Sequence, residues 1–461
     1  RQRLLGPDHP HTLDSRNNLA STLSDLGEHQ QAADLHRQIL TDSERLLGPD
    51  HPDTLDSRNN LAVALDGLGE HQQAADLHRQ TLTDRQRLLG PDHPHTLASR
   101  NNLANALSGL GEHQQAADLH RQILTDRQRL LGPDHPHTLD SRNNLASTLS
   151  DLGEHQQAAD LHRQILTDSE RLLGPDHPDT LDSRNNLAVA LDGLGEHQQA
   201  ADLHRQTLTD RQRVLGPDHP QTLSSRNNLA NALDGLGEHQ QAADLHRQNL
   251  TDRQRVLGPD HPQTLSSRNN LANALDGLGE HQQAADLHRQ NLTDRQRVLG
   301  PDHPQTLSSR NNLANALDGL GEHQQAADLH RQNLTDRQRV LGPDHPQTLS
   351  SRNNLANALD GLGEHQQAAD LHRQNLTDRQ RVLGPDHPQT LSSRNNLANA
   401  LDNLGEHQQA ADLHRQNLTD SERLLGPDHP HTLTSRNNLA VVQARLAEAG
   451  RRHWWRPARR R

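Results

Sequence analysis

The hexapeptide LGPDHP returns at a constant interval of 42 residues along the chain. Its first copy begins at Leu5 and its last at Leu425, with every interval the same length. A fixed period of this size is typical of arrays in which each repeat packs on its neighbours. The 461 residues are therefore predicted to form one elongated array, although the length alone suggests about three domains.

Each repeat divides into two helical segments. After Leu215, apolar residues recur at helical spacing from Pro220 to Leu236. Pro220 suits a first helical turn, and Gly237 suits the left-handed conformation that follows a last turn. Glu238 then opens a second helix, where a negative charge is favourable. Neither helix can bury its apolar stripe alone, so the pattern predicts stacked helix hairpins.

The repeat resembles the tetratricopeptide repeat, and its 42-residue length, NNLA run and LGPDHP linker are similar to the kinesin light chain variety. The resemblance extends from Arg1 to about Gly450. It implies an all-α fold, a right-handed superhelical solenoid of stacked antiparallel helix hairpins. The residues that carry it are Asn228, Leu229, Ala230, Leu233, Gly237, Ala242 and Leu245.

The chain departs from the family at positions where aromatic residues are usual, which here carry Leu233, His239 and His246. The sequence contains no Phe, Tyr, Met or Cys. We expect both histidines to be packed and uncharged there. Seven residues of helix separate them by about 10 Å, which is too far for one small metal ion. No metal and no cofactor are therefore expected.

The net charge and the absence of known motifs argue against several classes of function. The net charge is −13, and the repeats present no basic face for nucleic acid. No apolar run approaches the roughly 18 residues of a membrane span, so no membrane partner is expected. A cytoplasmic location is expected. The chain lacks a GxxxxGK[ST] loop, HExxH and GxSxG, which predicts a protein that is not an enzyme.

The repeat period also sets the predicted boundaries. Because Arg1–Leu4 match the end of a second helix, we expect the array to continue upstream of Arg1. In the tail, capping by Trp454 and Trp455 and weak nucleic-acid binding by arginines both stay open. The predicted segments are 1–4, the end of a preceding helix; 5–424, ten hairpin repeats; 425–450, a linker and capping helix; and 451–461, a disordered basic tail.

Polar residues recur on one face of the first helix. Ser224, Asn227, Asn231 and Asp234 lie three or four residues apart and therefore share a face. In the resembling family this face lines a concave groove, where asparagine amides hold the backbone of an extended peptide. The peptide-binding residues that this implies are Asn227, Asn228, Asn231, Asp234, Asn269, Asn270, Asn273, Asp276, Asn311, Asn312, Asn315 and Asp318.

The resemblance thus implies a non-catalytic scaffold that binds protein or peptide partners in its groove. The row of aspartates that includes Asp234 favours segments bearing Lys or Arg. One alternative is the ligand-sensing regulatory arm of a larger protein, with an N-terminal nucleotide-hydrolysing switch domain upstream. Two others are a polar face exposed only to solvent and a recently expanded array without a selected ligand.

Overall fold

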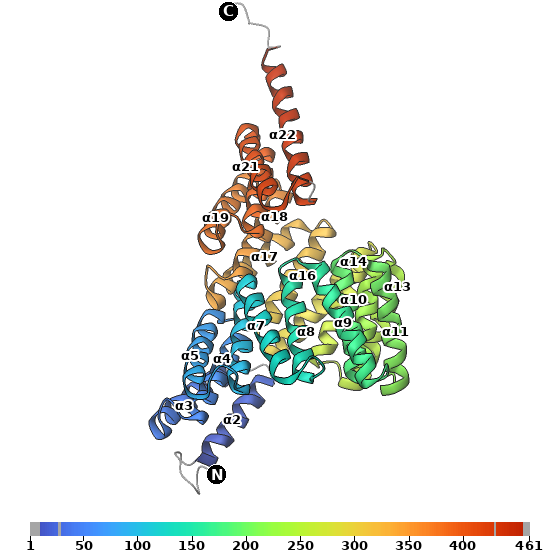
Figure 1. Ribbon diagram of the computed structural model, residues 1–461. Helices are drawn as coiled ribbons and strands as arrows, with labels where there is room; N and C mark the ends of the chain where they lie inside the picture. Colours follow the sequence, from blue (N-terminus) through green and yellow to red (C-terminus); the bar gives the residue numbers. More distant parts are fainter. Residues whose placement is uncertain (1–9, 26–28, 428–429, 455–461) are drawn as a thin grey trace, which may run out of the picture. The chain divides into compact units, whose positions relative to one another are not determined.

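The computed structural model describes residues 10–25, 29–427 and 430–454. All regular secondary structure in these ranges is helical, which confirms the predicted all-α class. Each repeat contributes a first helix, called helix A, and a longer second helix, called helix B. The chain divides into two compact units, Arg1–Leu236 and Gly237–Arg461. Figure 1 labels helices along the chain.

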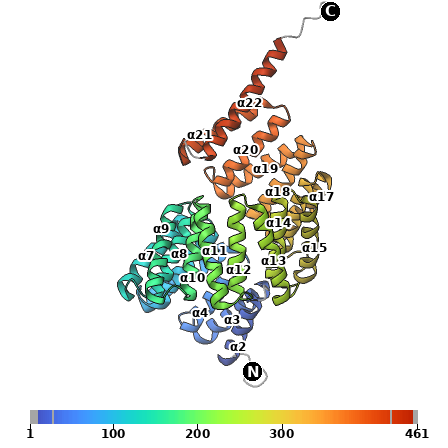
Figure 2. The ribbon, with the colours of Figure 1, turned by 90° about the vertical axis from the view of Figure 1, so that its right-hand side faces the viewer.

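In the first unit, consecutive helices pack side by side (Figure 2). Its helices A are α2 (Pro10–Asp25), α4 (Pro52–Gly67), α6 (Pro94–Gly109), α8 (Pro136–Asp151), α10 (Pro178–Gly193) and α12 (Pro220–Gly235). Its helices B are α3 (His29–Leu47), α5 (His71–Leu89), α7 (His113–Leu131), α9 (His155–Leu173) and α11 (His197–Leu215).

The second unit continues the same alternation. Its helices B are α13 (His239–Leu257), α15 (His281–Leu299), α17 (His323–Leu341), α19 (His365–Leu383) and α21 (His407–Leu425). Its helices A are α14 (Pro262–Gly277), α16 (Pro304–Gly319), α18 (Pro346–Gly361), α20 (Pro388–Asn403) and α22 (Pro430–Trp454). The prediction of stacked hairpins is confirmed in both units, whereas the right-handed sense of the solenoid stays a prediction.

The LGPDHP linker is a helix start. In α12, Pro220 occupies the first turn, and His219 Nδ1 accepts a hydrogen bond from the backbone N–H of Gln221 at 3.3 Å. Gly216 precedes this start with a φ of 91°, and Gly237 follows the helix with a φ of 78°. Both values are in the left-handed region that favours glycine. The expected roles of Pro220 and Gly237 are therefore confirmed.

The core consists mainly of leucine and alanine. In the first unit one cluster joins Leu61 and Leu65 of α4 to Ala74 of α5 and Leu103 of α6, across two repeats. Ala74 is fully buried between these helices. Stacking thus supplies a continuous core that no hairpin could build alone.

A buried ion pair fastens helix A to helix B. Arg310 of α16 donates from Nη1 to Asp336 Oδ2 of α17 at 2.6 Å, and the arginine side chain is 3% exposed. In the first unit Arg58 and Asp84 form the equivalent pair at 2.7 Å. We call this contact the hairpin clamp.

The last helix, α22, completes the second unit by packing on α21 (Figure 2). Val442 is 2% exposed and joins a cluster with Leu401, while Arg445 forms an ion pair with Asp402 of α20. The side chains of Trp454 and Trp455 lie outside the described residues, so both interpretations of the tail stay predictions.

Candidate functional site

The predicted groove residues lie on helices A. In α12, Asn227, Asn228 and Asp234 are half-buried, whereas Asn231 is exposed. The copies on α14 and α16 repeat this pattern, with the equivalent residues Asn273 and Asn315 exposed in the second unit. Each of these helices A therefore has one exposed and three half-buried residues among the predicted peptide-binding residues.

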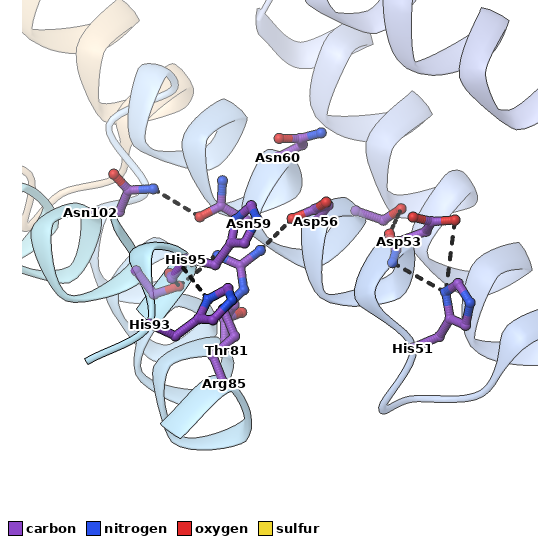
Figure 3. Close-up of polar contacts among 12 residues, drawn as sticks. His51, Asp53, Asp56, Asn59, Asn60, Thr81, Arg85, His93, His95 and Asn102 are labelled. Atoms are coloured by element: carbon purple, nitrogen blue, oxygen red, sulfur yellow. Dashed lines mark hydrogen bonds and ion pairs between the residues drawn. The ribbon is translucent and has the colours of Figure 1, made fainter. Parts of the chain in front are cut away.

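Adjacent asparagines link consecutive helices A. Asn228 donates from Nδ2 to Asn185 Oδ1 of the preceding repeat at 2.8 Å. In the second unit Asn312 donates to Asn269 at 2.7 Å. We call this series the asparagine ladder; Figure 3 shows the contact between Asn102 and Asn59. Equivalent bonds start from Asn60, Asn144, Asn186, Asn354, Asn396 and Asn438.

The ladder changes the role expected for these amides. Sequence reasoning assigned Asn228 and Asn312 to a peptide, but each of them holds a neighbouring repeat. Each bond uses one N–H and one oxygen lone pair of the two amides involved. A side-chain amide can make up to four hydrogen bonds, so the ladder retains both donor and acceptor capacity.

The aspartate row is also engaged. Asp276 accepts from His281 Nδ1 at 2.7 Å, and Asp318 contacts His323 Nδ1 at 2.8 Å. These contacts join the end of helix A to the start of helix B. Where an aspartate is replaced by Ser108, the hydroxyl contacts His113 at 3.2 Å instead.

The second carboxylate oxygen can hold a further donor. Asp360 Oδ2 accepts from Asn403 Nδ2 of the next helix A at 2.7 Å. Asp402 Oδ2 pairs with Arg445 of α22. The row therefore accepts amide and guanidinium donors that come from outside the repeat.

The two histidines of each helix B differ. His288 and His330 are 3% exposed, and burial lowers the pKa of each to about 4. The prediction of packed histidines is confirmed at this position. At the other position it is wrong, because His281 and His323 are half-buried and each contacts an aspartate. For His71, the hydrogen bond with Asp66 raises the pKa.

Ladder asparagines line several hollows between consecutive helices A. A hollow of about 320 Å³ between α6 and α8 is lined by Asn101 and Asn144. One of about 400 Å³ in the first repeat is lined by Asn17 and Asn60. In the second unit Asn395 lines one of about 310 Å³. Ladder asparagines therefore line hollows in each unit, whereas another hollow of about 480 Å³, beside Arg85, is lined by none of them.

A buried arginine on helix B was missed by sequence reasoning, which assigned Arg253 to a favourable charge at a helix end. The structure buries it and directs Nη1 to Ser267 Oγ at 3.0 Å on the next helix A. We call this the arginine position. Most repeats carry arginine there, whereas three carry Ser43, Ser169 and Ser421. The alternation between arginine and serine was the feature of the sequence from which this position could have been recognised.

No described helix is long and apolar enough to cross a membrane. Among the described residues, no group of three or more His, Asp or Glu side chains is arranged to hold a metal ion.

Stacked two-helix repeats with polar hollows between their first helices define a helical repeat scaffold. The chain belongs to the tetratricopeptide repeat family, whose model matches ten consecutive segments. They are residues 12–53, 54–95, 96–137, 138–179, 180–221, 222–263, 264–305, 306–347, 348–389 and 390–431. No curated protein matches the chain.

Solved structures include similar proteins. TPR-like repeats of a Podosopora anserina protein of kinesin light chain type are 31% identical and have a TM-score of 0.40, covering 44% of this chain and 97% of that one. BtubC (BKLC) from P. vanneervenii is 19% identical, with 50% and 91% covered and a TM-score of 0.39. A Rap protein complexed with competence and sporulation factor is 12% identical, with 86% and 99% covered and a TM-score of 0.45.

Proposed function

We propose that the chain is a non-catalytic interaction scaffold that binds extended peptide segments along its helices A. The asparagine ladder is the observation that carries this proposal. Its amides line hollows between helices A in both units, and the Asn-Asn pair that forms it recurs in each repeat of the sequence. The tetratricopeptide repeat family, which consists generally of non-catalytic scaffolds, supports the same conclusion.

The chemistry of the hollows suits a peptide backbone. Amides offer donors and acceptors, which an extended peptide also presents along its length. The repeats contain no Phe, Tyr or Trp to anchor a partner side chain, so a single contact is weak. Useful affinity then comes from the sum of equivalent contacts over several repeats.

The aspartate row favours basic segments. Asp276 and Asp318 are half-buried beside their histidines. Their negative carboxylates attract the positively charged side chains of a partner. The pairing of Arg445 with Asp402 provides an example within the chain. We therefore expect peptides with Lys or Arg to bind better than acidic peptides of the same length.

A peptide-array screen tests the proposal with the full chain and one triple variant, Asn231→Ala, Asn273→Ala and Asn315→Ala. These residues are exposed, so the replacements avoid the ladder bonds described above. We expect basic extended peptides to bind the native chain and to bind the variant several-fold more weakly.

The matched control replaces three exposed amides on helices B, Gln240→Ala, Gln282→Ala and Gln324→Ala. This control should bind peptides as the native chain does. Equal binding by both triple variants would contradict a groove on helices A. Absence of binding to all three proteins would favour the regulatory-arm alternative.

A further inference from the structure

The arginine position shows which chemical group the hollows accept. Arg85 of α5 lies between two helices A, and its side chain is 6% exposed (Figure 3). Its Nη1 donates to Ser99 Oγ at 2.7 Å and to the His95 carbonyl at 3.3 Å. Its Nη2 pairs with the carboxylate of Asp56. A hydroxyl, a carbonyl and a carboxylate thus surround one guanidinium.

The first repeat presents equivalent groups without the arginine. Ser43 stands at the arginine position, and its Oγ lies 3.3 Å from Ser57 Oγ. Ser57 Oγ donates to the Asp53 carbonyl at 2.8 Å, as Ser99 does to His95 at 3.0 Å. Asp14 takes the place of Asp56. A hollow of about 400 Å³ results, which is a size found for small-ligand sites.

The lining of this hollow suits an arginine side chain. Asp14, Asp53 and Asp56 contribute carboxylates, and no basic side chain is found among its described lining residues. Leu13 and Ile39 form apolar wall, against which the methylene stem of an arginine can pack. Asp14 also lies 3.4 Å from His11 Nδ1, and Asp56 already holds Arg85.

The same set recurs three repeats later. Residues 1–87 are identical to residues 127–213, so Ser169 again replaces the arginine and Asp140 supplies the carboxylate. Ser169 Oγ lies 3.2 Å from Ser183 Oγ, which donates to the Asp179 carbonyl at 2.8 Å. The geometry of the first site is therefore not peculiar to the start of the array.

We propose that the Ser43 and Ser169 sites each bind the arginine side chain of an extended partner segment. The inference rests on the proposed function, because these sites belong to the same groove, and it names the partner chemistry. Arginine fits better than lysine, since a planar guanidinium can reach three acceptors at once, as Arg85 does.

A ligand without a peptide backbone separates this inference from the proposed function. N-acetyl-arginine amide is titrated into the full chain by ligand-observed NMR, beside the lysine and citrulline equivalents. We expect the arginine compound to bind at least tenfold more tightly than either. Equal binding of all three compounds would overturn the inference, even where peptides bind the ladder.

Two double variants locate the binding. Ser43→Arg with Ser169→Arg fills both sites with the side chain that other repeats carry there and should abolish arginine binding. Asp14→Asn with Asp140→Asn should weaken it about tenfold by removing charge-assisted hydrogen bonds. Circular dichroism checks that both variants are folded. Undiminished binding to folded variants would place the ligand elsewhere and reject the proposal.

The control is Ser421→Arg. Ser421 also lines a hollow, of about 310 Å³, but Ser392 replaces the carboxylate there. Binding should therefore be unchanged in this variant. A loss equal to that of the double arginine variant would contradict the carboxylate-dependent site. Peptides carrying one arginine, tested on the same proteins, determine whether the partner is a chain or a free small molecule.

Discussion

At the residue scale, one buried position of helix B changes chemistry along the chain. It holds Ile123 in α7 and Thr207 in α11, but Asn291 in α15 and Asn333 in α17. Thr207 Oγ1 donates to the Leu203 carbonyl at 2.8 Å. Asn291 and Asn333 are fully buried, and neither end of either amide has a hydrogen-bond partner among the described residues. A buried unpaired amide is destabilising.

Replacing these asparagines by isoleucine should therefore stabilise the protein. We expect Asn291→Ile and Asn333→Ile each to raise the free energy of unfolding by about 1–3 kcal/mol. Ile123 already fits the position beside an arginine in α7. Urea denaturation followed by circular dichroism measures the change. Thr207→Ile is the control and should gain less, because its hydroxyl is paired; lower stability of both asparagine variants would refute the explanation.

The buried histidines predict a stability that depends on pH. Burial lowers the pKa of His330 to about 4, with Asp318 opposing and Arg337 adding to the shift. The unfolded chain keeps the ordinary value near 6.5 and binds the proton more tightly. Stability is therefore full above pH about 6.5 and falls toward pH 4, by up to about 1.4 kcal/mol per pH unit for each histidine.

His71 opposes this trend. Because its pKa is raised in the folded protein, His71 stabilises the fold when the pH is below the ordinary pKa of histidine. This contribution is lost as the pH rises through the raised pKa. Melting curves between pH 5 and 7 should nevertheless show a lower Tm at lower pH. His330→Phe should reduce this dependence by the share of one histidine, whereas His71→Gln, which removes an opposing contribution, should not reduce it. A flat native profile would contradict the prediction.

At the scale of elements, the hairpin clamp should matter more than ion pairs within one helix. In Asp336→Asn, buried Arg310 loses its carboxylate, at an expected cost of about 3–5 kcal/mol. Asp328 of the same helix pairs with Arg331 at 2.7 Å on the exposed surface. Asp328→Asn should cost less than about 1 kcal/mol. Chemical denaturation compares the two, and equal losses would contradict the role of burial.

The elements themselves were predictable from the sequence. Pro220 and Gly237 mark helix boundaries through local backbone preferences, and helical spacing of leucines identifies the buried face. The partner of each polar side chain was not predictable, because it lies on another helix. Asn228 therefore looked like a ligand contact although it bonds to Asn185.

The charged residues illustrate the same limit. Arg253 occupies the last turns of a helix, where a cation is locally favourable, but the next repeat buries it. His281 stands at a position where an aromatic residue was expected, but it forms a hydrogen bond with Asp276 of the preceding helix. Neighbouring elements decide these roles, and the spacing within one helix does not reveal them.

For the whole molecule, removal of one complete repeat should be tolerated. Deleting residues 304–345 removes 42 residues and rejoins His303 to Pro346, which restores the native linker sequence. We expect unchanged helicity per residue and a slightly lower Tm, because stability is roughly a sum over repeats and their interfaces. Circular dichroism and thermal melting provide both readouts.

The matched control deletes half a repeat, residues 304–324. This deletion brings a helix B against a helix B, where neither the ladder nor the arginine position finds its partner. It should lose helicity and cooperativity. Equal behaviour of the two deletions would contradict a fold held together by repeat-to-repeat contacts.

The asparagine ladder makes the repeats interchangeable parts. Asn144 donates to Asn101 in the first unit, and Asn354 donates to Asn311 in the second, in the same way. The bond forms although other residues of these hairpins differ. Recombination between repeats of the gene can then lengthen or shorten the product without creating an unfamiliar junction. Array length becomes a quantity that evolution can adjust in single steps, separately from the chemistry of each site.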